Sequence, residues 1–199
     1  MSLGSLKVLY LVVCLILGIA ILSPTLTGYV ILPHGEAFSE LWILGPNRLA
    51  EDYPFNVTAN RVYRVYLGVA DHMGDLEDYR VYVKLRNLTD SIPDVVNGTP
   101  SSLSPLGEYR VFLDENGIWE EIVDFSFEGI SFDGNFSRIS KLVLGNYVFY
   151  VDKTIVWDDE NQGFYCQLIF ELWRYNMTFS GFQFHNRFVG VWLNVTQSS

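Results

Sequence analysis

Six Asn-x-Ser/Thr triplets are the most informative motif in this chain. The side-chain amide of the asparagine in such a triplet is the acceptor for an N-linked glycan. None of the triplets has Pro in the middle, and chance gives only about one among 12 Asn and 23 Ser plus Thr in 199 residues. We therefore predict glycosylation on the surface of an extracytoplasmic protein. The six acceptors are Asn56, Asn87, Asn97, Asn135, Asn176 and Asn194.

Acidic turns are the second group of side chains with chemical potential. Asp158, Asp159 and Glu160 follow one another, and further acidic clusters occur at 71–78 and 114–116. Carboxylate oxygens at loop positions suit calcium, which often stiffens surface domains, although no cluster has the spacing of an EF-hand loop. The two interpretations are a structural calcium site at Asp158–Glu160 and plain solvated turn residues.

Two further segments are candidate binding surfaces. Glu51, Asp52 and Tyr53 lie in a loop that either binds a ligand or only shapes the chain between Gly45-Pro46 and Pro54. Phe182 and Phe184 belong to a stretch with four Phe in ten residues (179–188), around an expected hairpin or loop. Exposed rings there predict a partner surface or a membrane-facing edge, whereas buried rings predict only core.

Catalytic patterns are missing from the sequence. His34, His72 and His185 are far apart, without zinc-ligand spacing, and we interpret them as surface residues. There is no Gly-x-Ser-x-Gly elbow and no phosphate-binding or dinucleotide-binding glycine loop. We therefore expect no enzyme and no cofactor beyond the calcium hypothesis, and a hydrolase with an unrecognised carboxylate pair is the least favoured alternative.

The N-terminus predicts export. After Lys7, the run Val8–Leu32 carries no charge and is long enough to cross a bilayer. A positive flank kept in the cytoplasm places the rest of the chain and its C-terminus outside. We expect residues 1–7 to be cytoplasmic, 8–32 to form a single transmembrane anchor, and 33–199 to form the outer domain. The alternative is a signal peptide cut near residues 23–29.

Charge and cysteine content narrow the class of protein. All 23 acidic residues follow the apolar run and the net charge is −10, which argues against nucleic-acid binding. Cys14 lies in the apolar run and Cys166 is alone beyond it, so the outer domain has no internal disulfide. The phase of Cys166 predicts a buried structural thiol rather than a reactive one. A glycosylated exterior domain without disulfides indicates a prokaryotic, most naturally archaeal, cell surface.

The outer domain reads as strands and turns. Residues alternate between apolar and polar in Tyr63–Val69 and in Tyr79–Leu85, where Arg80, Tyr82 and Lys84 form the polar face. Turn residues separate these segments from the others, which predicts an all-β ectodomain with an immunoglobulin-like antiparallel β-sandwich. The other candidate strands are Glu40–Leu44, Tyr109–Leu113, Trp119–Phe127, Ile139–Leu144, Val148–Trp157, Phe164–Trp173 and Arg187–Val195.

Period-two phasing also predicts which residues are buried. In the last strand Val189, Val191, Leu193 and Val195 share the face expected to be buried, and Asn194 faces outward with Trp192 and Thr196. Cys166 shares an apolar face with Leu168, Phe170 and Leu172.

Several stretches carry a family resemblance. The segment 39–56 (SELWILGPNRLAEDYPFN) and the closing runs Leu168–Arg174 and Val191–Val195 resemble the archaeal membrane-protein family catalogued as domain of unknown function 1616. The resemblance spans residues 29–197 and implies an exterior β domain on a membrane stem, without an activity. Members often carry several membrane helices before this domain, whereas one is predicted here.

These observations lead to two functional hypotheses. The first is a cell-surface N-glycoprotein whose ectodomain is a non-enzymatic binding or structural module with protein partners at the cell surface. The second is an accessory subunit of a larger membrane or envelope complex, such as one for glycan transfer, secretion or a surface filament.

Overall fold

The computed structural model describes residues 3–29 and 37–197, in two compact units, Met1–Ala37 and Phe38–Ser199. The described part of the first unit contains helix α1 (Leu3–Tyr29), which covers most of the predicted anchor. Residues 30–32 of that anchor lie outside the described residues. Among the described residues, no helix meets the length and apolarity of a membrane span.

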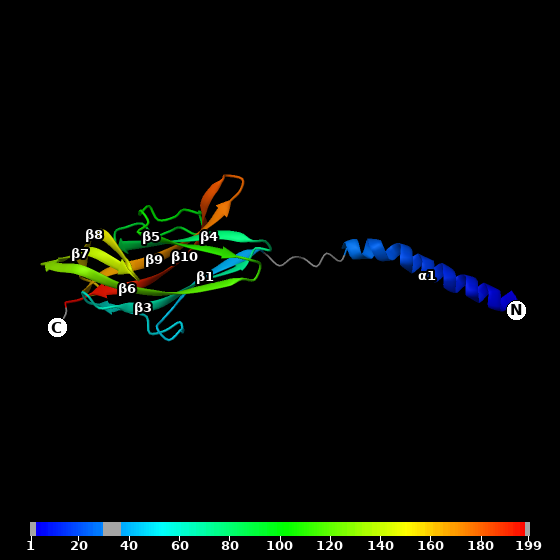
Figure 1. Ribbon diagram of the computed structural model, residues 1–199, viewed down its shortest axis with the longest axis horizontal. Helices are drawn as coiled ribbons and strands as arrows, with labels where there is room; N and C mark the ends of the chain where they lie inside the picture. The colour runs from blue at the N-terminus through cyan, green and yellow to red at the C-terminus, as the bar shows by residue number, and fades with distance from the viewer. Residues whose placement is uncertain (1–2, 30–36, 198–199) are drawn as a thin grey trace. The chain divides into compact units, whose positions relative to one another are not determined.

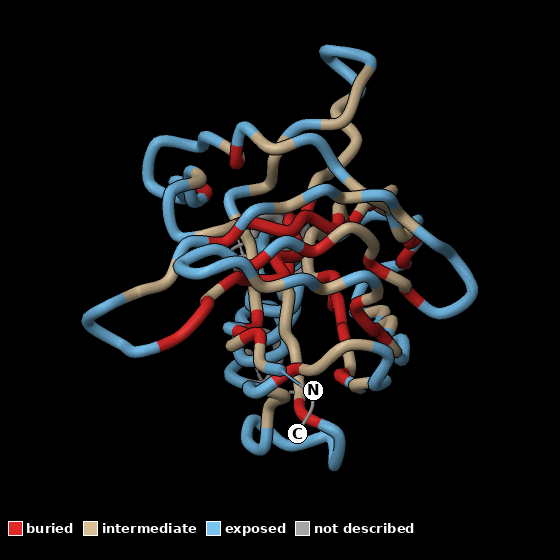
Figure 2. Tube along the Cα trace, turned by 90° about the vertical axis from the view of Figure 1, so that its left-hand side faces the viewer, coloured by how far each residue is buried: buried red, intermediate tan, exposed pale blue. Residues whose placement is uncertain are grey.

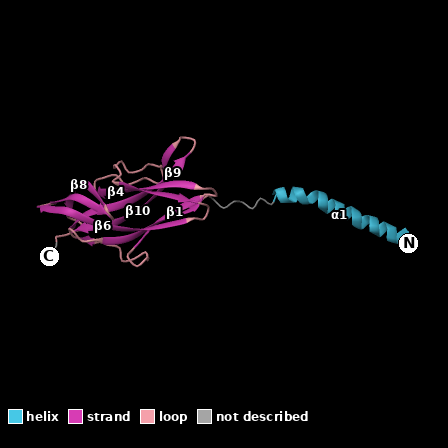
Figure 3. Cartoon of the chain, in the orientation of Figure 1, coloured by secondary structure: helices cyan, strands magenta, loops and turns pink. Residues whose placement is uncertain are grey.

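In the described part of the second unit, called the β unit below, strands are the only regular secondary structure (Figure 3). All nine predicted strand segments lie within observed strands, and the all-β prediction is confirmed. The strands are β1 (Phe38–Leu44), β2 (Asn56–Val57), β3 (Tyr63–His72), β4 (Glu77–Asn87), β5 (Gly107–Leu113), β6 (Ile118–Asp133), β7 (Phe136–Leu144), β8 (Tyr147–Asp158), β9 (Gly163–Asn176) and β10 (Gly181–Val195).

These strands form one curled, ten-stranded sheet (Figure 1). Its order is β1-β3-β6-β7-β8-β9-β10-β2, and β4 pairs with both β9 and β5. All pairings are antiparallel except that between β2 and β10. Two residue pairs, Trp157↔Phe164 and Asp158↔Gly163, join β8 to β9, so this ladder is as short as that between β2 and β10.

Both halves of the curled sheet contribute to one hydrophobic core. Figure 2 shows the buried residues, in red, gathered toward the middle of the β unit. One half supplies core residues such as Val65 of β3 and Phe125 of β6, and the other half supplies Leu168 of β9 and Leu193 of β10. Of the residues predicted to be buried, only Val189 is not: it packs against the core while remaining partly exposed. It lies shortly after the irregularity that shifts the register of β10 between Phe184 and Arg187.

The polar face predicted for β4 is not a solvated face. Lys84 and Arg86 are buried beneath the β4–β5 loop (88–106). Lys84 Nζ lies 2.8 Å from Glu171 Oε2 on β9 and donates to the carbonyl of Ser101 in the loop at 2.9 Å. Arg86 donates to Gln167 Oε1 at 2.9 Å. The β4–β5 loop covers this end of the polar face, and Glu171 and Gln167 on β9 pair with its two cations. Arg80 and Tyr82, on the same face, remain partly exposed.

Candidate functional site

A groove with aromatic walls lies where β2, β9 and β10 meet the β8–β9 turn. It has a volume of about 360 Å³, and we call it the Trp192 groove. A second hollow of about 390 Å³ adjoins it, because the two share Leu88 and Asp158. The Trp192 groove is lined by Phe55, Leu88, Asp158, Asn161, Tyr165 and Trp192.

The alternation of β9 and β10 sets the aromatic walls. Val191 and Leu193 point into the core, so Trp192 between them faces outward and is 41% exposed. Tyr165 lies next to the buried Cys166 and donates its hydroxyl to the carbonyl of Asn161 at 2.7 Å. The ring centroids of Phe55 and Tyr165 are 6.0 Å apart. The groove therefore presents flat apolar faces whose orientation the sheet and one hydrogen bond fix.

Acidic and amide groups form the polar side of the groove. Asp158 Oδ1 accepts hydrogen bonds from the backbone N–H groups of Glu160 and Asn161, and Oδ2 accepts from the Asn161 amide at 2.8 Å. The bonds from Asn161 are the main reason that the pKa of Asp158 is lowered. Asp158 is thus ionised at neutral pH and can accept hydrogen bonds from a ligand.

The three calcium candidates lie together at these hollows. Asp158, Asp159 and Glu160 all line the second hollow. Within residues 3–29 and 37–197, no group of three His, Cys, Asp or Glu side chains has metal-binding geometry. Calcium binding at Asp158–Glu160 stays a prediction.

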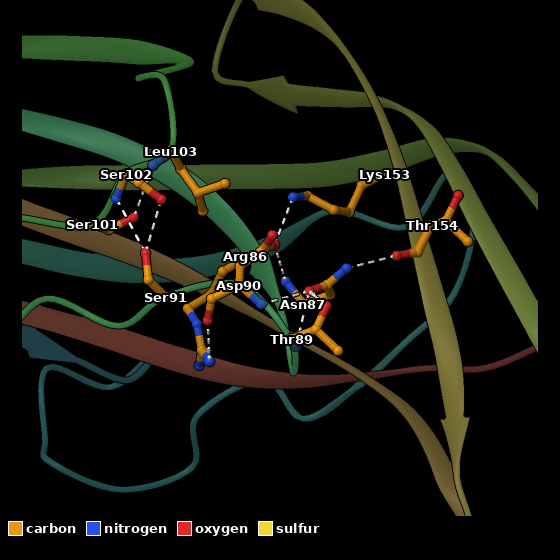
Figure 4. Close-up of polar contacts among 10 residues, drawn as sticks. All are labelled: Arg86, Asn87, Thr89, Asp90, Ser91, Ser101, Ser102, Leu103, Lys153 and Thr154. Atoms are coloured by element: carbon orange, nitrogen blue, oxygen red, sulfur yellow. Dashed lines mark hydrogen bonds and ion pairs between the residues drawn. The ribbon is translucent and has the colours of Figure 1, made fainter.

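A polar network holds the end of β4 beside the second hollow (Figure 4). Asp90 Oδ2 accepts from Lys153 Nζ at 2.7 Å and from the Asn87 N–H at 2.8 Å. Asn87 donates its side-chain amide to the Thr154 carbonyl at 3.0 Å, which ties the end of β4 to β8. Burial raises the pKa of Asp90, but the Lys153 and Asn87 hydrogen bonds and nearby cations outweigh it, so the pKa is lowered overall.

None of the six predicted glycan acceptors is buried. Asn97 and Asn135 are exposed in turns, and Asn176 is partly exposed near the tip of the β9–β10 hairpin. The other three surround the groove: Asn87 lines the second hollow, Asn56 follows Phe55, and Asn194 is two residues from Trp192. Asn194 faces outward, as its phase predicts, while Val195 is buried.

The other candidate binding segments lie outside the groove lining. Glu51 and Asp52 are exposed, whereas Tyr53 donates its hydroxyl to the Ile43 carbonyl at 2.8 Å. A Cβ on Gly45 would come within 1.9 Å of the Glu51 carbonyl oxygen, so this loop packs directly on the end of β1. The segment is therefore a loop between β1 and β2 that packs against the end of β1.

The Phe-rich segment combines both predicted environments. Phe182 and Phe184 are partly buried in β10: the Arg80 guanidinium lies 4.0 Å from the Phe182 ring centroid, and Phe184 packs near Trp173 at 6.1 Å. The hairpin tip before them projects from the sheet, orange in Figure 1, and exposes Met177 (86%) and Phe179 (68%).

One polar cluster was not anticipated. His185 is partly buried rather than a surface residue, with its ring centroid 6.2 Å from that of Tyr79, whose hydroxyl donates to Asp71 Oδ1 at 2.6 Å. Burial, followed by the charges of Arg174 and Arg187, lowers the pKa of His185 to about 4. The cluster joins residues of β3, β4 and β10, which lie far apart in the sequence, so no local sequence signal marks it.

His72 and the outer cysteine play structural parts. His72 stacks on Phe38 with centroids 4.6 Å apart, and His34 lies outside the described residues. Cys166 is buried in the core, as its phase predicts, and burial raises its pKa to about 12. Its thiol is therefore protonated at neutral pH.

Comparison with protein families gives one assignment. A family model described as "Domain of unknown function (DUF1616)" matches residues 32–143, more than half of the chain. The chain belongs to this family. A comparison with curated proteins found no match.

Solved structures show only distant likenesses to this family member. A β-glucosidase from Listeria innocua superposes with a TM-score of 0.42 at 8% identity, over 82% of this chain and 16% of the enzyme. This chain therefore spans about a sixth of that enzyme's length. The CARDB domain of a Pyrococcus furiosus protein, solved in complex with di-metal ions, gives 0.38 at 8% identity over 80% of this chain and 89% of that chain.

Proposed function

We propose that the chain is a single-span, N-glycosylated cell-surface protein of archaeal type, and that its β unit is an immunoglobulin-like sandwich acting as a non-enzymatic binding module. The uncharged run Val8–Leu32 and the six sequons beyond it support export. That none of the six acceptors is buried supports glycosylation. A single core shared by both halves of the sheet supports the sandwich.

The Trp192 groove is the binding site in this proposal, and a neutral saccharide is its ligand class. Phe55, Tyr165 and Trp192 offer flat apolar faces to the C–H faces of a sugar ring. Asp158 and Asn161 offer acceptors and donors to its hydroxyl groups. This convergence of aromatic and polar groups on one cleft is the observation that carries the proposal. The net charge of −10 and the Asp158 carboxylate disfavour an anionic ligand.

Binding of the detergent-solubilised full chain to an array of neutral oligosaccharides tests this site, followed by calorimetry with the best ligand. Trp192→Ala removes the largest wall and should weaken binding by about tenfold, the effect of losing one aromatic contact of about 1.4 kcal/mol. Phe112→Ala is the control, because Phe112 is 64% exposed on β5 and lies outside the groove lining. Equal affinities of Trp192→Ala and the parent chain for the saccharide would show that the groove is not the binding site.

The membrane anchor needs its own experiment. A retained anchor predicts that the protein stays in the pellet after carbonate extraction and that its N-terminal peptide, including Lys7, is intact. A mature N-terminus after Leu22, with the protein released by carbonate, would establish the signal-peptide alternative instead.

The second candidate, an accessory subunit of a membrane or envelope complex, is favoured by the β9–β10 hairpin tip. Met177 and Phe179 are exposed there at 86% and 68%, and exposed apolar side chains that project from a sheet suit a partner surface. Purification from native membranes distinguishes the two candidates. A stoichiometric partner that dissociates on Met177→Ser/Phe179→Ser supports the subunit, and a solitary protein supports the independent module.

A further inference from the structure

Two of the six sequon asparagines are direct neighbours. Strands β2 and β10 pair in parallel with Asn56 opposite Asn194. The Asn194 side-chain amide Nδ2 donates to Asn56 Oδ1 at 3.0 Å, and Asn194 Oδ1 accepts from the Phe164 N–H at 3.1 Å. Both ends of the Asn194 carboxamide are therefore engaged, and they link β2 to the start of β9.

The surroundings of Asn194 hold this arrangement in place. Its backbone N–H donates to the Phe55 carbonyl at 2.7 Å, and the hydroxyl of Thr196, the third residue of the sequon, donates to the Val57 carbonyl at 3.3 Å. On the other side, a Cβ on Gly163 would lie only 2.7 Å from Asn194 Oδ1, so the carboxamide packs closely on that backbone. The acceptor amide and the sequon hydroxyl are thus both engaged in folding contacts.

Asn56 is in the opposite situation. It is exposed, its neighbour Val57 is fully buried, and its side chain therefore points outward. Asn56 uses only its Oδ1 in the contact with Asn194. Glycan attached to the Asn56 nitrogen leaves that oxygen free to accept the same hydrogen bond.

We propose that Asn56 carries the glycan of this pair and that Asn194 stays unmodified as a structural carboxamide; the inference rests on the N-glycosylation proposed above. In the transfer, the Asn56 Nδ2 forms a bond to the anomeric carbon of a lipid-phosphate-activated glycan and loses one proton. The bond from that carbon to the phosphate oxygen breaks, and the lipid phosphate leaves with the electron pair. At Asn194 the nitrogen that would react is the one that donates to Asn56 Oδ1, so the same reaction there disturbs the contact that joins β10 to β2.

Site-resolved glycopeptide mapping of the full chain tests the inference, in a host that N-glycosylates exported proteins. We expect glycan on the Asn56 peptide and an unmodified Asn194 peptide. Asn56→Gln and the exposed-turn control Asn135→Gln should each lose the mass of one glycan. Asn194→Gln should lose none, but its longer side chain displaces the amide, and its melting temperature should fall by about 4 °C.

Each other result overturns the inference in a distinguishable way. Glycan on the Asn194 peptide, or a lost glycan mass in Asn194→Gln, refutes the assignment. So does glycan at other sequons with Asn56 empty, which leaves the glycoprotein proposal intact. An unchanged melting temperature for Asn194→Gln refutes the structural role. Complete absence of glycan from all six peptides refutes this inference and the proposed glycosylation together.

Discussion

Glu171→Gln should be among the most damaging single-atom changes in the β unit. The Glu171 and Lys84 side chains are 0% and 3% exposed, and their charged atoms lie 2.8 Å apart. The carboxylate also accepts from the Ser101 N–H at 2.9 Å and from Trp173 Nε1 at 3.2 Å. Every group that faces the carboxylate is a donor, so a glutamine must turn its own N–H groups toward one of them.

The cost follows from the charge that remains. Glu171→Gln leaves the Lys84 ammonium buried without a counter-ion, and breaking a buried pair in this way costs about 3–5 kcal/mol. That is a large part of the 5–15 kcal/mol by which a domain is typically stable. The double variant Lys84→Met/Glu171→Gln removes the stranded charge and should recover at least half of the loss. Because the pair is buried, added salt should change its contribution to the free energy of unfolding very little.

Urea unfolding of the full chain in detergent, followed by tryptophan fluorescence, measures the loss. Backbone hydrogen exchange measures how far the β4–β5 loop loosens in the variant. Ser101 in this loop donates its N–H to Glu171 and accepts from Lys84 through its carbonyl. Asp124→Asn is the control, because it neutralises the Arg64–Asp124 pair, which is partly exposed, and should change stability far less. A Glu171→Gln loss below about 1 kcal/mol, with unchanged exchange in the loop, would refute this reasoning.

Three further outcomes are expected. Val191→Asp should prevent folding, because it places an unpaired charge at a core position that is 3% exposed; a soluble, cooperatively melting variant would contradict the core. Gly45→Ala should destabilise by about 2 kcal/mol through its clash with the Glu51 carbonyl, and limited proteolysis should then cut at residues 46–52. His185 has a folded pKa near 4, below its unfolded value, so the unfolded chain binds more protons between pH 6.5 and 4 and stability falls as pH drops through that window. Melting curves of His185→Gln should show a shallower decline there than those of His72→Gln.

Strand positions could be predicted because they depend on local alternation. Each apolar face of β9 and β10 is visible as a period of two, and burial of Cys166, Leu168 and Leu193 followed from it. The two-residue strand β2 was missed, since Asn56 and Val57 alone have no period and are strand residues only through pairing with β10.

The candidate site could be predicted only in part. The sequence marked Asn56, Asn87, Asn194 and Asp158, but not that they surround one groove, because that juxtaposition depends on which strands pair. The burial of Lys84 was missed for a related reason. Alternation identifies two faces of a strand, and it does not show that a loop of distant residues covers the second one.

The pairing of β2 with β10 has a consequence for the timing of folding. The hydrogen-bonded Asn56 and Asn194 are 138 residues apart in sequence, and Arg86 is 81 residues from its partner Gln167. Neighbouring strands such as β6 with β7 and β9 with β10 can pair early, but the core cannot close before residues 181–195 have been synthesised. Sheets with such distant partners fold slowly, over milliseconds to seconds. Until β10 has been made, the edges of β2 and β9 that it covers lack their partner, and such unpaired strand edges are prone to aggregate.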